Sequence, residues 1–212
     1  MKFFSYDSKF SQIILKICSG GFLNMLWFVC SIPIFTVGAS TAALFSVTLK
    51  IARDENPRLV PDFIKAFRDN FKQATVVWLI MLGFGMLLGA DGYILYHLYR
   101  STAGSIAVIC TIGLALIIVA SIAYVIVLMY VFPLIASVRN TNFNMLKFSL
   151  LIGIRYLFCT ILMFAIYFAM FFVVVAVFTP LIAFGFGVCA LLCSYLLVNV
   201  LQAVSYVEEE AE

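Results

Sequence analysis

Four long stretches of the chain lack charged side chains almost completely, and this pattern limits the fold more than any other feature. The stretches are residues 17–49, 73–97, 101–138 and 156–207. A helix that crosses the hydrocarbon layer of a membrane needs about 20 consecutive apolar residues. Each stretch is long enough for at least one crossing, so the sequence predicts an all-α, polytopic membrane protein.

The overall composition excludes the common soluble classes. Of the 212 residues, 65% are hydrophobic and only 11% are charged, whereas a soluble domain carries about 25% charged residues. So few charges cannot cover a water-facing surface, which excludes a soluble enzyme and a disordered chain. The net charge of +3 is too small to suggest a nucleic-acid partner.

Proline residues divide the stretches into individual helices, because proline removes a helical hydrogen bond and clashes with the preceding turn. Pro180 splits the last stretch, Pro133 bends or ends the third, and Pro33 interrupts the first. We therefore expect a single integral membrane domain, a transmembrane helical bundle of five or six segments. The six segments lie at about 17–36, 40–54, 74–98, 104–132, 156–178 and 181–205.

The first stretch is too long for one upright crossing and short for two. We expect a short or broken hairpin, with a break at Pro33–Gly38 and a second helix capped by Ser40 or Thr41. The break must be packed within the protein or line a cavity, because unsatisfied backbone groups cannot face lipid. Two alternatives remain open: one tilted span, which would give five segments, and a signal peptide with a cleavage site at residues 37–39.

A cytoplasmic amphipathic helix is predicted at about 61–72, starting at Pro61. Phenylalanines recur in it every four residues and are interleaved with basic side chains. The residues are Phe63, Lys65, Phe67, Arg68, Phe71 and Lys72. One interpretation is a helix at the lipid interface, with its bases near anionic headgroups. The other is a docking helix for a cytoplasmic partner.

Two blocks of polar, aromatic and small residues stand out within the first hundred positions. They comprise Asn24, Trp27, Pro33, Gly38, Ser40, Thr41, Phe67, Asn70, Phe71, Lys72 and Trp78. These blocks resemble the YesL-like family of bacterial multi-pass membrane proteins. The length and the pattern of spans agree with that family over essentially the whole chain.

The YesL-like family is a domain of unknown function, so the resemblance implies a context rather than an activity. Its members resemble products of genes that lie beside carbohydrate ABC transporters and sugar-use operons. From this context, our first hypothesis is a non-enzymatic accessory or regulatory component of carbohydrate ABC transport, in the plasma membrane of a bacterium. We expect residues 54–73 to contact the transporter subunits.

Polar residues within the predicted spans give a second hypothesis, a small transporter or channel. Asp91 is the only acid within a span, and a charge at the centre of a membrane costs about 3 kcal/mol or more and often marks function. Asp91 with His97 suggests a proton relay, although the neighbouring tyrosines also fit an aromatic belt at the membrane interface. Asn24, Asn199 and Gln202 complete the candidate polar site, with hydrogen bonds between helices as the simpler explanation.

The remaining reactive side chains form no recognisable catalytic or metal motif. The six cysteines lie in apolar runs, and with a single histidine in the chain they lack the spacing of a zinc site. The sequence also lacks a phosphate-binding loop and a nucleophile paired with a base. We therefore expect no enzyme activity, no metal and no cofactor, and leave open whether the chain forms an oligomer.

The basic residues predict the orientation in the membrane. If the first hairpin returns to its starting side, 12 of the 13 Lys and Arg residues lie on one side and only Arg100 lies on the other. Lys and Arg accumulate in cytoplasmic loops. Both termini are therefore predicted to be cytoplasmic.

A reporter enzyme fused ahead of Met1 tests this orientation. We expect a reporter that works only in the cytoplasm to be active, because the first hairpin returns the chain to the side on which it started. Activity of a reporter that works only outside the cell would contradict the six-segment topology and favour a single tilted first span.

Overall fold

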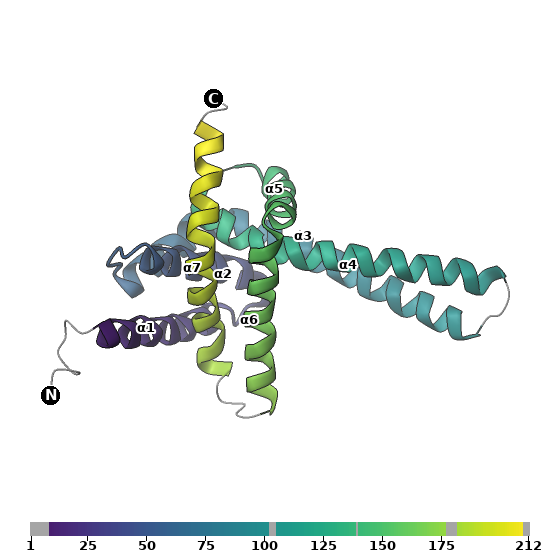
Figure 1. Cartoon of the computed structure of the whole chain (residues 1–212), viewed down its shortest axis with the longest axis horizontal. Helices are drawn as coiled ribbons and strands as arrows, with labels where there is room; N and C mark the ends of the chain where they lie inside the picture. Colours follow the sequence, from purple (N-terminus) through teal and green to yellow (C-terminus); the bar gives the residue numbers. More distant parts are fainter. Residues whose placement is uncertain (1–8, 102–104, 139, 177–181, 210–212) are drawn as a thin grey trace.

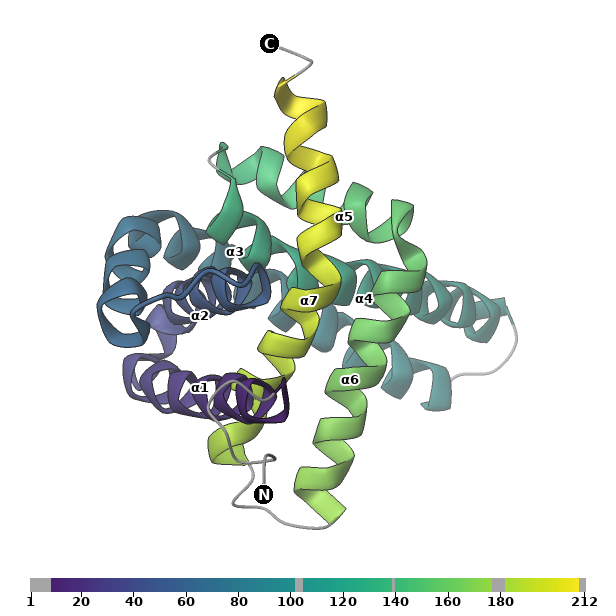
Figure 2. The ribbon, with the colours of Figure 1, turned by 60° about the vertical axis from the view of Figure 1, so that its left-hand side comes forward.

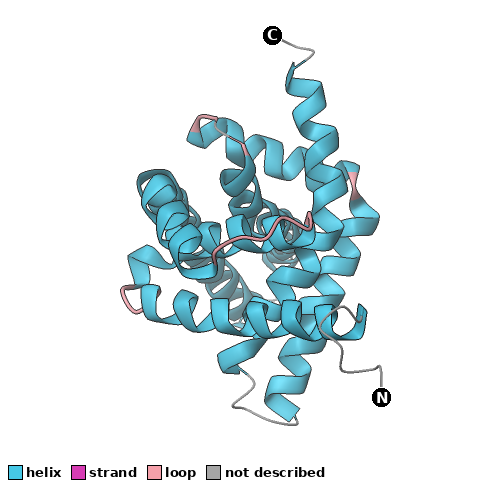
Figure 3. Cartoon of the chain, turned by 90° about the vertical axis from the view of Figure 1, so that its left-hand side faces the viewer, coloured by secondary structure: helices cyan, strands magenta, loops and turns pink. Residues whose placement is uncertain are grey.

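The computed structural model describes residues 9–101, 105–138, 140–176 and 182–209. Within these ranges the chain forms seven α-helices and one short 3₁₀ helix, without a strand (Figure 3). The helices are α1 (Lys9–Cys30), η1 (Ile34–Thr36), α2 (Val37–Ala52), α3 (Leu59–Ser101), α4 (Ser105–Ser137), α5 (Asn142–Arg155), α6 (Leu157–Ala176) and α7 (Ile182–Glu209).

Six helical segments within the described ranges are long and apolar enough to cross a membrane. They lie in α1, in η1 together with α2, and in α3, α4, α6 and α7. The prediction of an all-α, polytopic membrane fold is therefore confirmed. The remaining helix, α5, is shorter and carries Lys147 and Arg155.

The helices associate as three antiparallel pairs. α1 packs beside α2, α3 beside α4, and α6 beside α7. The pair of α3 and α4 extends far out from the rest of the molecule, whereas α6 and α7 run across this direction (Figures 1 and 2). The bundle is therefore splayed, and the helix pairs diverge from a common centre.

α2 forms this centre. Twelve of its 16 residues are buried, and it contacts α1, α3, α4 and α7. Small residues in its first turns let the neighbouring helices approach closely. A Cβ atom on Gly38 would lie 2.5 Å from both the Ala74 carbonyl oxygen and the Trp78 Cβ, so only glycine fits at that position.

The break between α1 and α2 lies earlier in the chain than predicted. α1 ends at Cys30 rather than near residue 36, because Pro33 follows closely and the residue before a proline avoids helical conformation. α2 already begins at Val37, so the predicted cap at Ser40 or Thr41 is wrong. Both hydroxyls instead donate to the Val37 carbonyl oxygen, at 3.1 and 2.7 Å.

α3 is one continuous helix rather than the two predicted at 61–72 and 74–98. Its 43 residues span about 64 Å at 1.5 Å per residue. Phe63 is fully buried, and Phe67 and Phe71 pack against the same core. Phe63 therefore faces protein, whereas Phe67 and Phe71 are half-buried, and the location of this part of α3 at the lipid interface stays a prediction.

Two features between the third and fourth stretches differ from expectation. α4 continues through Pro133 to Ser137 instead of ending near that proline. α5 is not predicted, because it is too short and too polar to read as a span. Its buried residues Met145, Ser149 and Ile152 have the spacing of a one-sided helix, which is the signal that could have found it.

The last two spans lie close to their predicted positions. α6 covers Leu157–Ala176 and α7 covers Ile182–Glu209, where spans at 156–178 and 181–205 are predicted. The predicted break at Pro180, the predicted boundaries at 104, 178 and 181, and the predicted side of Arg139 concern positions outside the described residues.

α1 and α7 cross in direct backbone contact. A Cβ atom on Gly187 would collide with the carbonyl oxygen of Gly20 and would lie 2.9 Å from the Cβ of Asn24. The Asn24 side-chain oxygen accepts a hydrogen bond from the Gly187 backbone N–H at 3.0 Å. The crossing therefore depends on the absence of a side chain at residue 187.

Replacing this glycine should destabilise the protein, whereas a matched glycine on α3 should tolerate the change. We expect Gly187→Ala to lower the free energy of unfolding by about 1–3 kcal/mol, because overpacking forces the two backbones apart. Gly89→Ala is the control, because nothing lies within 4 Å of a Cβ at that position. Thermal unfolding in detergent measures both, and equal stability of the two variants would contradict the crossing.

Candidate functional site

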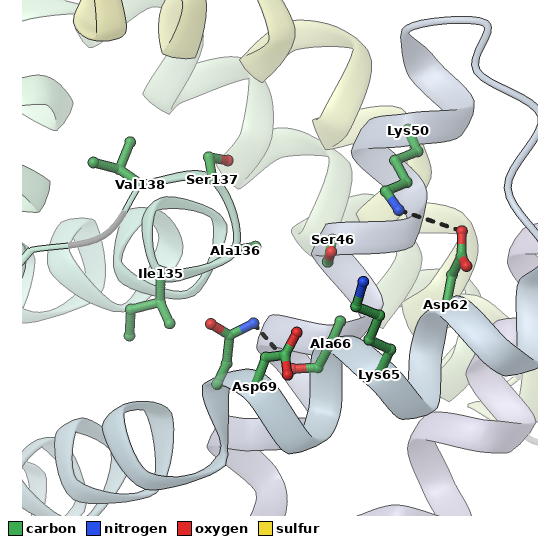
Figure 4. Close-up of a pocket in the computed structure, with 11 residues that line it drawn as sticks. Ser46, Lys50, Asp62, Lys65, Ala66, Asp69, Ile135, Ala136, Ser137 and Val138 are labelled. Atoms are coloured by element: carbon green, nitrogen blue, oxygen red, sulfur yellow. Dashed lines mark hydrogen bonds and ion pairs between the residues drawn. The ribbon is translucent and has the colours of Figure 1, made fainter.

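A polar cleft lies where the end of α2, the first turns of α3 and the end of α4 meet. Its cavity has a volume of about 190 Å³. Lys50 comes from α2, and Asp62, Lys65 and Asp69 come from three successive turns of α3 (Figure 4). The last turn of α4, around Ser137, closes the opposite wall.

The cleft presents charges of both signs. The Lys50 ammonium lies 3.3 Å from an Asp62 carboxylate oxygen, and the Lys65 side chain extends toward Ser46 (Figure 4). Asp69 is exposed at the rim. Lys50 and Asp62 are both partly exposed, so this ion pair adds little stability and its charges remain accessible to another molecule.

The size of the cleft indicates what it can accept. Pockets that enclose small-molecule ligands have volumes of about 300–1,000 Å³ and are mostly apolar. This cleft is smaller and carries four charged side chains. It fits a polar side chain of a partner protein better than an enclosed small molecule.

The structure separates the members of the predicted intramembrane polar site. Asp91 and His97 are exposed on the part of α3 that extends beyond the core, where His97 packs on the Tyr93 ring with the centroids 4.4 Å apart. Asn24 is buried between α1 and α7. Asn199 and Gln202 lie exposed near the other end of α7.

In contrast, residues from the two sequence blocks that resemble the YesL-like family lie close together. The Trp27 indole N–H donates to the Thr41 hydroxyl at 3.0 Å, which ties α1 to α2. The Trp78 indole N–H donates to the Ile34 carbonyl oxygen at 2.8 Å, which ties α3 to the break. These side chains position the first hairpin on α3, so their role in the structure is to hold the fold.

Asn70 connects the second block to the cleft. It lines the cavity, and its side-chain N–H donates to the Ala66 carbonyl oxygen one turn earlier at 3.0 Å. Asn70 therefore belongs both to the second block and to the lining of the polar cleft. The cleft is not predicted from the sequence, because its walls form only when the ends of α2 and α4 pack beside the first turns of α3.

An apolar cavity adjoins the same hairpin on the membrane side. It has a volume of about 370 Å³ and includes both tryptophans, Trp27 and Trp78. A groove of about 540 Å³ between α4 and α6 shares Val125, Met129 and Phe164 with it. No charged side chain lines the cavity or the groove, so both spaces match lipid or an apolar ligand.

Within the described ranges, no three His, Cys, Asp or Glu side chains are grouped so that they could hold a metal ion. The six cysteines are unpaired, and Cys189 and Cys193 are buried one turn apart on α7. Side chains with this location contribute apolar packing.

Helices that cross a membrane and a small polar cleft at one end define the class as an α-helical integral membrane protein. Residues 22–92 match the family model described as "Protein of unknown function, DUF624". This match includes the end of α1, all of α2 and most of α3. It supports a relationship with that family over about a third of the chain.

A curated protein is also similar to this chain. The "Uncharacterized protein YteU" of Bacillus subtilis (strain 168) is 26% identical over 161 residues, which cover 71% of this chain and 66% of the relative. The chain thus spans about two thirds of the length of that protein. No solved structure matches.

Two asparagines of the predicted polar site should respond differently to substitution. We expect Asn24→Ala to lower the free energy of unfolding by about 1 kcal/mol, the scale of a hydrogen bond between membrane helices, because it removes the acceptor for Gly187. Asn199→Ala is the control on an exposed position of α7. Thermal unfolding of both variants in detergent measures the difference, and a larger loss for Asn199→Ala would contradict the assignment.

Proposed function

We propose that the protein is a non-enzymatic accessory or regulatory component of a carbohydrate ABC uptake system in a bacterial plasma membrane. The polar cleft between α2, α3 and α4 is the observation that carries this proposal. It presents accessible charges of both signs where the ends of α2 and α4 meet the first turns of α3. The carbohydrate context rests on the resemblance to the YesL-like family.

The surface beside the cleft supports docking of a protein partner. Along the first turns of α3, Ile64, Lys65 and Arg68 are exposed, whereas Phe63 on the opposite side is buried. An exposed apolar side chain next to charged ones is typical of a contact surface whose charges steer the encounter with a partner. The segment 54–73 thus has an exposed face that does not pack on the core and is available to a partner.

The shape of the molecule supports a topology in which this surface is cytoplasmic. The start of α1, the connection from α2 to α3, α5 and the end of α7 lie to the left and top of Figure 1. The far ends of α3 and α4, and the lower ends of α6 and α7, point to the right and downward. If the membrane normal runs between these two directions, the start of α1 and the end of α7 share the side of the basic residues, which is consistent with a cytoplasmic location for that side.

A small transporter or channel is the alternative. Its proposed pathway would need Asp91 and the polar residues of α7 to line one route. Asp91 is exposed on the extended part of α3, whereas α7, which carries the exposed Asn199, packs mainly on α1, α2 and α6. This separation favours the accessory role. Solute flux in proteoliposomes that contain only this protein would reverse the preference.

Charge reversal on the exposed face of α3 tests the accessory role. We expect the double variant Lys65→Glu and Arg68→Glu to lose co-purification with ABC transporter subunits after mild solubilisation. It should also reduce sugar uptake in a strain that lacks the native gene. The physical reason is that like charges at a docking surface disfavour the complex.

Lys147→Glu provides the matched control, because Lys147 is an exposed lysine on α5, away from the cleft. This variant should keep both co-purification and uptake. Isolation of the unaltered protein without transporter subunits, together with normal uptake in the deletion strain, would contradict the proposal.

A further inference from the structure

The charge-free part of each helix in the first hairpin is shorter than the hydrocarbon layer of a membrane is thick. Residues 17–30 of α1 are free of charge, and these 14 positions rise by about 21 Å at 1.5 Å per residue. Residues 37–49 of α2, 13 positions without charge, rise by about 20 Å. The hydrocarbon layer is about 30 Å thick, so the charge-free part of neither arm covers it, although Ser11–Cys30 and Ile34–Ala52 as wholes have the length and apolar composition of a membrane span.

Both arms start from the same side of the molecule. The Lys16 ammonium of α1 lies 2.5 Å from a carboxylate oxygen of Asp54, which follows α2. Lys50, in the last turn of α2, pairs with Asp62 at the start of α3. These two contacts fix the open end of the hairpin at the level of the polar cleft.

Distances along α3 give an independent measure of where the closed end of the hairpin lies. The tip contacts α3 at Trp78, whose indole donates to the Ile34 carbonyl oxygen. Along α3, Trp78 lies 22 residues before Arg100 and 13 before Asp91, which is about 33 Å and 20 Å along the helix axis. The tip therefore ends well short of the surface that Asp91 and Arg100 approach.

The tip itself is apolar and exposed. Ile32, Ile34 and Phe35 have exposed fractions of 72%, 71% and 50%. A turn that emerged into water between two membrane helices would be expected to carry polar residues. Side chains of this kind at the end of a hairpin match a hydrocarbon environment instead.

The backbone at the tip is adapted to that environment. The Thr36 hydroxyl lies 2.6 Å from the Cys30 carbonyl oxygen and 2.7 Å from that of Pro33, and Trp78 donates to the carbonyl of Ile34. Irregular backbone within a membrane requires such internal partners, because no water is present to provide them. The Thr36 hydroxyl carries one proton, and the Pro33 carbonyl also accepts from the Thr36 backbone N–H at 2.9 Å. The carbonyl groups of Cys30, Pro33 and Ile34 thus have partners within the protein.

We propose that α1 and α2 form a re-entrant hairpin whose tip, residues 32–35, ends inside the hydrocarbon layer and contacts lipid acyl chains. The hairpin enters and leaves on the side of the polar cleft. The assignment follows from the lengths of the arms, the contact with Trp78 and the composition of the tip. It does not depend on which side of the membrane is cytoplasmic or on the proposed accessory role.

Side-specific cysteine labelling tests this topology. In a background without the six native cysteines, Ile34→Cys is compared with Asn56→Cys in the connection from α2 to α3 and Ser101→Cys at the end of α3. A membrane-impermeant maleimide is added to intact cells and to inverted vesicles. We expect Asn56→Cys and Ser101→Cys to react from opposite sides and Ile34→Cys to react from neither until the protein is denatured.

A spin label at the same three cysteines identifies what surrounds the tip. We expect the label at residue 34 to be accessible to oxygen, which partitions into lipid, and shielded from a water-soluble nickel chelate. Shielding from both reagents would show that protein covers the tip and would overturn the lipid contact. Labelling of Ile34→Cys from the side of Ser101→Cys would show a full crossing, and labelling from the side of Asn56→Cys would place the tip in water; either result overturns the proposal.

A photo-crosslinking variant avoids dependence on the cysteine-free background. Ile34 is replaced by p-benzoylphenylalanine in the otherwise native chain, with the same replacement at Asn56 as the control. After irradiation in vesicles of radiolabelled phospholipid, residue 34 should form a phospholipid adduct. Adduct formation at residue 56 but not at residue 34 would contradict the proposed depth of the tip.

Discussion

Every backbone polar group inside a membrane must find its partner within the protein, and the break between α1 and α2 is where this chain meets that requirement. Thr36 and Trp78 satisfy the carbonyl groups of the break. The contact of Trp78 also fixes α3 against the hairpin, and Gly38 lets the two helices approach. The central position of α2, and with it the packing of α3, α4 and α7, depends on these few interactions.

α2 joins two different environments over a short distance. Its first turn directly follows the apolar tip, and Lys50 in its last turn lines the polar cleft. Between them, the Thr48 hydroxyl lies 2.8 Å from that of Ser194 on α7. A partner that binds at the cleft would therefore touch the helix on which the rest of the fold is assembled.

Charge distribution and proline positions were sufficient to predict the class of fold and the approximate spans, because the cost of a charge in lipid acts on every residue independently. They did not predict the continuity of α3, because Lys72 suggests a surface at a point where the helix simply continues. The cleft also escaped prediction, since Lys50 and Asp62 meet only after α2 packs on α3. The intramembrane polar residues were found individually, but sequence alone could not show that Asp91 is exposed on the extended part of α3 while Asn24 is buried against α7.

The continuity of α3 has a mechanical consequence. Asp62 and Lys65 lie in its first turns at the cleft, and the same uninterrupted helix reaches Ser101. An α-helix resists bending where neither proline nor a bulge weakens it. A pivot of about 5° at the cleft would displace the far end of a 64 Å helix by about 5 Å. A small rotation at the charged start of α3 would thus be transmitted along the helix as a large displacement of its far end in lipid.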